Sequence, residues 1–427
     1  MLTSGAMRRY RERSGKVFSR GMLAAGVLAA ASLSAAVVGA GPAGAASALG
    51  APHAATLSPV TIGLISDGGA GSSIGTAALV EQGAKAAVAY QNAYGGGLEG
   101  HKITLYICEN GSTPAGGQTC ANNMVQHGVV AVVEPFTGQG QTEVPTIVGA
   151  GIPYITMSGA STPELTSPGA FALEGGFPAA LGAMALSAKQ HGYKHVSYLV
   201  DNVPAAIQGA QVLGGLVFKA AGVGFTVIPV NSGTADISPQ LQSAVSSGAD
   251  AVGFVGDVSL CSSFLQAYNT LSLKLPRYVL STCQDPSILN SATLDKALAG
   301  SYIVTTTKSS KSELALYAAV MKKFAPKVNS DPNVSSNQAS GLAPVLALAA
   351  IMKGSTQPVT AAGIKTQTQT ATNVVIPLSG GITFTCNGTA IPLLKSVCSS
   401  ASAIGVIQSG KAGKITGIKV YNPTPLF

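Results

Sequence analysis

A chain of 427 residues is too long for a single hydrophobic core and long enough for two. Its formal net charge of +8 arises mostly at the start, because the first 20 residues hold six of the 25 Lys and Arg residues and only one of the 17 Asp and Glu residues. The remaining 19 basic and 16 acidic residues are nearly balanced, and no basic stretch is interleaved with aromatic residues, so we expect no nucleic-acid partner.

Residues 1–48 have the pattern of a secretory signal peptide. A basic stretch that ends at Arg20 precedes the uncharged segment Gly21–Ala40, which is rich in Ala and Gly. The small residues that follow offer two cleavage sites, Ala43-Gly44-Ala45 or Ala46-Ser47-Ala48. A retained membrane anchor is the alternative, because the apolar segment approaches the length of a membrane span. We expect cleavage, and therefore an exported protein of the cell envelope or the medium.

Apolar runs alternate with helical patterns through the next part of the chain. Bounded apolar runs of this length are typical of the buried strands of a parallel sheet. The predicted strands are Val60–Ile65, Lys102–Cys108, Val129–Val133 and Ile152–Thr156. The predicted helices are Ile74–Ala93, Gln118–Gln126 and Thr142–Gly149.

The segment Gly151–Thr166 is informative because an apolar run stops in a loop of small and hydroxylated residues before a short helix. In open α/β sheets, ligands bind just beyond the carboxyl ends of the strands. The donors expected there, suited to a carboxylate or another anionic group, are Ser158, Ser161, Thr162 and the free amides of Gly159 and Ala160. The alternative is an ordinary strand-to-helix loop with Thr162 as the helix N-cap.

The alternation resumes after a break near Phe171–Phe177. The predicted strands are Val196–Val200, Phe225–Val230, Ala251–Val255 and Tyr278–Leu280. The predicted helices are Ala179–Gln190, Ala205–Ala220, Pro239–Ser246 and Ser259–Asn269. Strands that alternate with helices form parallel sheets covered on both faces. The sequence therefore predicts an α/β fold of two doubly wound parallel-sheet lobes joined by a hinge, at 56–175 and 176–305.

Residues 306–427 are less regular. The predicted helices are Leu314–Phe324 and Gln338–Met352, and the predicted strands are Ile382–Thr385, Ala403–Gln408 and Ile415–Val420. We expect this segment to return through both lobes.

All six cysteines follow the predicted signal peptide. An even number without a C-x-x-C motif in an exported chain predicts disulfides rather than a zinc site. Several pairings are possible, and nearest-neighbour pairing is the simplest because each bond closes one local loop: Cys108–Cys120, Cys261–Cys283 and Cys386–Cys398. No histidine has a metal-ligand partner at a useful spacing, so we expect no metal site.

Three segments resemble one family. They are Asn92-Ala93-Tyr94-Gly95-Gly96-Gly97 followed by Gly100-His101-Lys102, the loop 158–166, and 234–241 followed by Gly248-Ala249-Asp250-Ala251. They are similar to motifs of the substrate-binding proteins of ABC transporters, in the branch that includes the leucine/isoleucine/valine-binding protein. The resemblance implies a periplasmic-binding-protein type I fold and a small polar ligand, an amino acid or a related compound, in an interlobe cleft. It also implies a permease partner, a monomer, and neither enzymatic activity nor a cofactor.

The resemblance also indicates where ligand contacts would lie. The candidates in the first lobe, besides the loop 158–162, are Ser66, Asp67, Phe136, Thr137 and Gly138, and those in the second lobe are Asp201, Asp257 and Asp285. Gly138 stands where the family's amino-acid binders have a serine, and Thr282 stands where they have an acidic residue for the ligand's ammonium group. Asp257 and Asp285 are the neighbouring substitutes, and Asp201 serves equally well as a capping residue.

Two other functions remain open. Gly71-Ser72-Ser73-Ile74-Gly75 satisfies the G-x-S-x-G pattern of α/β-hydrolases, although that motif turns directly off a strand and here several residues intervene. A secreted serine hydrolase using Ser73 is therefore one alternative. The other is an exported ligand-sensing module that serves a receptor instead of a permease.

Overall fold

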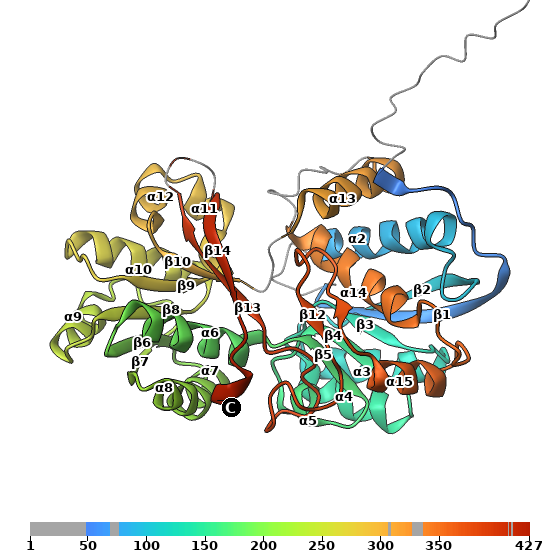
Figure 1. Cartoon of the computed structure of the whole chain (residues 1–427), viewed down its shortest axis with the longest axis horizontal. Coiled ribbons are helices and arrows are strands. Elements are labelled where there is room, and N and C mark those ends of the chain that lie inside the picture. The colour runs from blue at the N-terminus through green and yellow to red at the C-terminus, as the bar shows by residue number, and fades with distance from the viewer. Residues whose placement is uncertain (1–47, 69–76, 306–308, 327–335, 409, 411–412) are drawn as a thin grey trace, which may run out of the picture. The chain divides into compact units, whose positions relative to one another are not determined.

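A computed structural model describes residues 48–68, 77–305, 309–326, 336–408, 410 and 413–427. The predicted signal peptide up to residue 47 and Ser73 lie outside these residues. The α/β fold class is confirmed, because two largely parallel sheets are each covered by helices on both faces (Figure 1). We call the first sheet with its helices lobe 1 and the second lobe 2.

The sheet of lobe 1 has five parallel strands in the order β2-β1-β3-β4-β5. The strands are β1 (Leu57–Ser66), β2 (His101–Glu109), β3 (Val132–Glu134), β4 (Tyr154–Ser158) and β5 (Ala170–Glu174). The helices that connect them are α2 (Ala77–Tyr90), extended by a π-helical turn (Gln91–Gly95), α3 (Pro114–Gln126), α4 (Gly140–Gly149) and α5 (Thr162–Thr166). Because all strands are parallel, their carboxyl ends meet at one edge.

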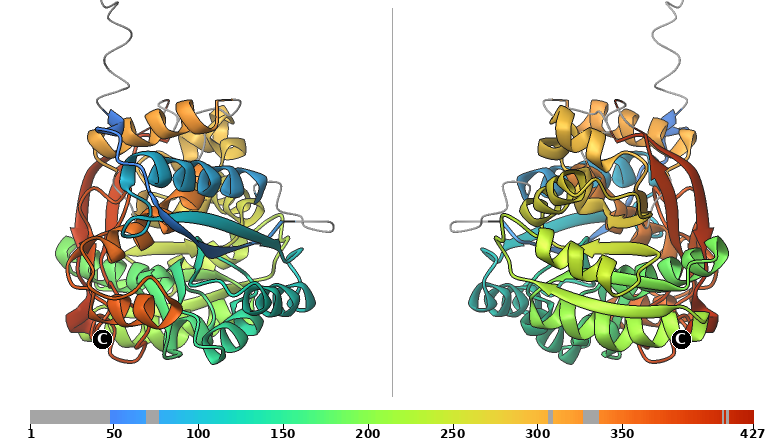
Figure 2. Two further views of the ribbon diagram at one scale, coloured as in Figure 1. Left: turned by 90° about the vertical axis from the view of Figure 1, so that its right-hand side faces the viewer. Right: turned by 90° about the vertical axis from the view of Figure 1, so that its left-hand side faces the viewer.

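The core of lobe 1 has two layers, one on each face of the sheet. Alternate residues of β1 divide between them: Ile62 and Leu64 pack with α2, whereas Ile65 packs with α3 and α4. The first layer is completed by helices from the C-terminal part of the chain, α13 (Lys311–Phe324), α14 (Ser336–Met352) and α15 (Ala361–Thr370) (Figure 2). Lobe 1 is therefore not contiguous in sequence.

The closest helix packing in lobe 1 joins α2 to α14. A Cβ atom added to Gly83 would overlap the backbone carbonyl of Gln338, and one added to Gly341 would overlap the carbonyl oxygen of Val80. The two glycines, one on each helix, therefore allow the backbones of α2 and α14 to come into contact.

The sheet of lobe 2 has seven strands in the order β14-β13-β10-β9-β8-β6-β7. The strands are β6 (His195–Asp201), β7 (Gly224–Val230), β8 (Ala251–Val255), β9 (Arg277–Leu280), β10 (Tyr302–Thr305), β13 (Ser402–Ile407) and β14 (Ile415–Tyr421). The first five are parallel, and β13 and β14 add antiparallel strands at one edge. The C-terminal segment, orange to red in Figure 1, thus completes both lobes.

Helices cover both faces of the second sheet. The helices are α6 (Gly176–His191), α7 (Pro204–Gly209), α8 (Gly215–Ala221), α9 (Ser238–Ser246), α10 (Val258–Thr270), α11 (Pro286–Leu289) and α12 (Ala292–Leu298). Apolar residues of α6 and α8 pack on one face, and those of α9, α10 and α12 pack on the other. A π-helical turn (Ala210–Gly214) joins α7 to α8 inside the single helix predicted there.

The three predicted disulfides are confirmed. Cys108–Cys120 joins the end of β2 to α3, Cys261–Cys283 joins α10 to the turn after β9, and Cys386–Cys398 closes a loop after the short hairpin of β11 (Val374–Val375) and β12 (Thr383–Phe384). The structure has no free cysteine among the residues it describes.

Six helices and strands of the described part of the chain were not predicted. The strand β5 (Ala170–Glu174) was missed: it is fully buried beside β4 and overlaps the segment Phe171–Phe177, where the sequence pattern breaks. The strands β10 and β11 and the helices α11, α12 and α15 were also missed. No helix in the described part of the chain is long and apolar enough to cross a membrane.

Candidate ligand-binding site

Three of the predicted loops lie side by side at the carboxyl edge of lobe 1. They follow β1, β3 and β4, which are neighbours in the sheet. Ser66 is the last residue of β1, and its side-chain hydroxyl accepts a hydrogen bond from the amide of Gly68 (3.3 Å). Ser158 ends β4, and its amide donates to the carbonyl of Pro135 in the loop after β3 (3.3 Å). The structure thus brings the predicted lobe 1 residues together.

Asp67 ties the first of these loops to the second. Its Oδ1 accepts hydrogen bonds from Thr137 Oγ1 (3.0 Å) and Asn110 Nδ2 (2.8 Å), and its Oδ2 accepts one from the amide of Gly138 (3.2 Å). The side chain of Thr137 is buried, whereas Phe136 beside it is 54% exposed. The β3 loop therefore presents an apolar ring to solvent, while its hydroxyl and amide donors bind a carboxylate of the chain itself.

The loop after β4 forms a helix cap. Ser161 is the N-cap of α5, and its hydroxyl accepts a hydrogen bond from the amide of Glu164 (3.4 Å). Glu164 Oε2 in turn accepts the amides of Ser161 (2.8 Å) and Ala160 (3.0 Å). Two expectations are therefore corrected: the N-cap is Ser161 and not Thr162, and the amide of Ala160 is not free.

A buried group of acidic residues lies directly behind these loops and was missed by the sequence analysis. Glu134 at the end of β3, Glu143 in α4 and Glu164 in α5 are all fully inaccessible to solvent. The hydroxyl of Tyr154 lies 3.1 Å from Glu134 Oε2 and 3.3 Å from Glu164 Oε1. Asn110 Nδ2 donates to Glu143 Oε1 (2.9 Å), which links this acidic cluster to Asp67.

Burial dominates the electrostatics of the acidic cluster, because it disfavours the charged form of each carboxyl group. Burial and the nearby carboxylates raise the pKa of Glu134 well above its usual value. Burial raises the pKa of Glu143 to about 7, although the hydrogen bond from Asn110 opposes the shift. Burial also raises the pKa of Glu164 against the amide hydrogen bonds of its cap. Protons are therefore part of this cluster near neutral pH.

The acidic cluster does not have the geometry of a metal centre. Within the described part of the chain, no group of three or more His, Cys, Asp or Glu side chains is arranged to hold a metal ion.

The aspartates predicted in lobe 2 all have structural partners. Asp201 ends β6 and accepts a hydrogen bond from Ser232 Oγ (2.6 Å). Asp257 is the N-cap of α10 and accepts the amide of Leu260 (2.7 Å). Asp285 caps α11, with its Oδ1 accepting the amide (2.8 Å) and hydroxyl (2.6 Å) of Ser287. Asp201 is the last residue of β6, and Asp257 and Asp285 come after β8 and β9, so all three lie toward the carboxyl edge of the second sheet.

A sequence model of the family described as periplasmic binding protein matches residues 59–393. The chain belongs to the periplasmic binding protein family. The matched residues begin in β1 and end after β12, so they include the predicted candidate residues of both lobes. The resemblance inferred from the sequence is confirmed at the level of the family.

Several solved periplasmic binding proteins share this fold. A leucine binding protein from Thermotoga maritima is 17% identical with a TM-score of 0.66, and the match covers 85% of this chain and 99% of that one. A solute binding protein from R. palustris in complex with 4-hydroxybenzoate is 16% identical with a TM-score of 0.66, and the match covers 86% of this chain and 98% of that one. A fatty acid ABC transporter substrate-binding protein from Thermomonospora curvata is 13% identical with a TM-score of 0.67, and the match covers 87% of this chain and 95% of that one. None of the curated proteins matches the chain.

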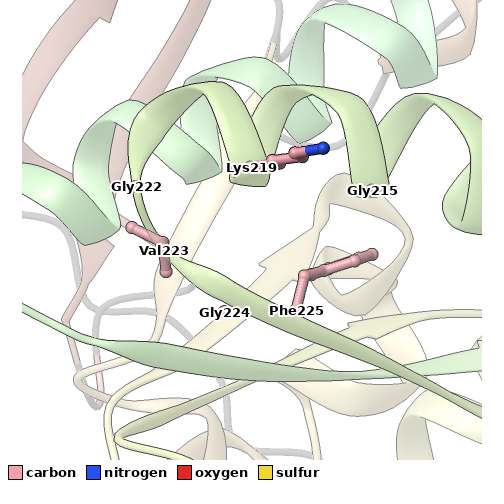
Figure 3. A pocket seen from close by; sticks show the side chains of 6 residues that line it. All are labelled: Gly215, Lys219, Gly222, Val223, Gly224 and Phe225. Atoms are coloured by element: carbon pink, nitrogen blue, oxygen red, sulfur yellow. The ribbon is translucent and has the colours of Figure 1, made fainter.

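This periplasmic binding protein also has a hollow of about 430 Å³ away from the predicted site. Figure 3 shows the Lys219 side chain of α8 above Val223 and Phe225, with Gly215, Gly222 and Gly224 completing the lining. Gly224 and Phe225 open β7, so the hollow lies at the amino end of that strand. Ligands of open α/β sheets bind at the opposite ends of the strands, and none of the predicted site residues lines this hollow.

The capping role of Asp257 gives a first prediction. Asp257→Ala should lower the free energy of unfolding by about 1 kcal/mol, because the amide of Leu260 loses its acceptor at the start of α10. Asp257→Asn should retain most of that stability, since asparagine caps helices as well as aspartate does. Urea unfolding of both variants measures the difference, and equal losses in the two would contradict the capping role.

Proposed function

We propose that this periplasmic binding protein captures a small polar molecule, an amino acid or a related compound, between its two lobes for an ABC importer. The observation that carries the proposal is the convergence of the loops after β1, β3 and β4 at one sheet edge, in a chain of this family. The signal-peptide pattern supports export. The protein would act as a monomer that delivers its ligand to a membrane permease.

Lobe 1 supplies the first contacts in this proposal. The exposed face of Phe136, the polar end of β4 at Ser158 and the hydroxyl of Thr162 are presented at the edge, while the buried Thr137 fixes the β3 loop. Closure then brings the carboxyl edge of lobe 2 over the ligand, with Asp201, Asp257 and Asp285 as candidate contacts. A rigid lobe 1 suits this role, because the carboxylates of Asp67 and Glu164 already fix its loops.

Ligand binding should raise the stability of the protein. A ligand present at a hundredfold excess over its Kd adds about 2.7 kcal/mol to the free energy of unfolding. A thermal-shift screen of amino acids, amides, urea, small carboxylates and aromatic acids should therefore yield at least one compound that raises the melting temperature. Isothermal titration calorimetry should show that such a compound binds to a single site per chain.

The competing functions give different outcomes. Labelling of Ser73 by a serine-reactive phosphonate, together with turnover of simple esters, would overturn the binding-protein proposal in favour of a hydrolase. Capture of a receptor domain by the ligand-loaded protein, without capture of a permease, would support the sensing role instead.

A further inference from the structure

Residues 422–427, which follow β14, contact both lobes, and we call them the strap. They are the dark red segment at the C mark in Figure 1. On the side of lobe 2, a Cβ atom added to Gly182 of α6 would overlap Pro423, so the strap lies directly against the backbone of that helix. Leu426 is buried in the apolar layer that contains residues of α6 and α8. The strap is therefore anchored in the core of lobe 2.

The strap also contacts lobe 1, through the loop 386–398 that a disulfide closes. The hydroxyl of Thr424 donates a hydrogen bond to the carbonyl of Ala390 in this loop (3.0 Å). The ring of Phe427 packs against a cluster that contains Ile391 of the same loop, and it packs against the apolar layer of lobe 2 as well. Both cysteines of the disulfide lie in the core of lobe 1. The strap therefore joins the two lobes by contacts that are not covalent.

One of the segments in which the chain crosses between the lobes is hydrogen-bonded to the strap. This crossing, Ser399–Ala401, leads from the disulfide-closed loop to β13. The buried hydroxyl Ser400 Oγ lies 2.7 Å from Asn422 Oδ1 and 2.6 Å from Thr424 Oγ1. A rotation of the lobes about the crossing therefore acts on the strap directly.

A second crossing, from β5 to α6, lies against the first. A Cβ atom added to Gly175 would overlap the carbonyl oxygen of Ser399. One added to Gly176 would lie 3.0 Å from Ser158 Oγ, at the end of β4 where the predicted ligand loop begins, and its φ of +53° favours glycine. The ligand loop, the two crossings and the strap are therefore in contact in this order.

The arrangement of the lobes that the strap joins leaves apolar side chains accessible at both carboxyl edges. Phe136 follows β3 in lobe 1 and is 54% exposed, and Val203 follows β6 in lobe 2 and is 44% exposed. Neither side chain is covered by the other lobe in this arrangement.

We propose that the strap restrains the hinge: it holds the lobes in this arrangement and has to leave the loop 386–398 before they close on a ligand. The inference rests on the proposed function for the ligand and adds a restraint on closure to it. Closure rotates one lobe against the other, and a segment that is fixed to both lobes opposes such a rotation. Ligand binding then has to overcome the restraint, which lowers the apparent affinity.

The first test measures the distance between the lobes and needs no ligand. Spin labels attached through a keto amino acid at Val125 of α3 and Val245 of α9 suit this purpose, because both side chains are exposed and the disulfides stay intact. The double variant Thr424→Val/Phe427→Ala removes the hydroxyl donor and the ring that contact lobe 1. Double electron–electron resonance should show a broader distance distribution in this variant, displaced from that of the wild type.

Thr389→Val and Phe324→Ala are matched controls. Thr389 is an exposed residue of the loop 386–398, and its hydroxyl donates to Asn387 (2.6 Å) instead of contacting the strap. Phe324 of α13 has a half-buried ring that packs within lobe 1. Both controls should keep the wild-type distance distribution. If the double variant also keeps it, even with a lower melting temperature, the strap only contributes packing and the proposal is overturned.

The second test uses a compound found in the thermal-shift screen. Its Kd should fall about threefold to tenfold in the double variant, because closure no longer has to break the strap contacts. The two controls should bind the compound as the wild type does. An unchanged or higher Kd in the double variant would overturn the proposal. A screen without any hit would count against the proposed function, whereas the spin-label distances would still decide the role of the strap.

Discussion

Gly341→Ala should lower the free energy of unfolding by about 3 kcal/mol, although alanine is the better helix former by about 1 kcal/mol. The added Cβ atom would overlap the carbonyl oxygen of Val80, which belongs to the backbone of α2 and cannot rotate away. Gly83→Ala should have a similar effect, because its Cβ atom would overlap the carbonyl of Gln338 in α14. Urea unfolding followed by circular dichroism measures both losses.

Gly149→Ala is the matched control. Gly149 also lies in a helix, α4, but a Cβ atom added there would meet nothing within 4 Å. This variant should therefore be as stable as the wild type or slightly more stable. A gain in stability for Gly341→Ala comparable to that of Gly149→Ala would show that α2 and α14 do not pack through these glycines.

The protein should be more stable at pH 5 than at pH 8, with Glu143 alone contributing about 3 kcal/mol to the difference. Burial raises the pKa of Glu143 from 4.5 to about 7, so the folded state holds this proton more tightly than the unfolded state. The stabilisation is present in full below pH 4.5 and is lost as the pH rises through 7. Glu134 and Glu164 act in the same direction, because their pKa values are also raised.

Glu143→Gln should remove most of this pH dependence between pH 5 and pH 8. The amide still presents an oxygen to Asn110, and it has no proton to lose in this range. Glu99→Gln, which removes an exposed carboxylate, serves as the control and should leave the dependence as in the wild type. Chemical denaturation at the two pH values measures the effect, and a wild type that gains stability from pH 5 to pH 8 would contradict it.

The sequence pattern was sufficient to predict the fold because burial on both faces of a parallel sheet leaves bounded apolar runs. The strand Ala251–Val255 was predicted with the bounds that β8 has in the structure. The strand β5 was missed because Ala170–Glu174 contains a glutamate and follows a loop of Ser, Pro and Gly, so it resembles a break. The helix α15 was missed because Ala361–Thr370 is rich in Thr and Gln and lacks an apolar stripe.

The candidate site was predictable only in part. The positions of the loops follow from the topology, since the end of each strand fixes where its loop lies. The topology does not show which hydrogen-bond donors in these loops are already occupied, because the partners are far apart in sequence. Asp67 and Gly138 are separated by 71 residues, and Asn110 and Glu143 by 33. The capping box of Ser161 and Glu164, by contrast, has a local signature in the Ser-Thr-Pro-Glu sequence and could have been recognised.

The return of the C-terminal segment through both lobes has a consequence for the order of folding. The described residues up to Thr305 form ten strands, but the helices α13 and α14 that cover one face of the first sheet come later in the chain, and so do β13 and β14 of the second sheet. A growing polypeptide therefore exposes apolar surface on both halves until synthesis is almost complete. Neither half can reach its stable state alone, so the last hundred or so residues act as the closing step for the entire molecule.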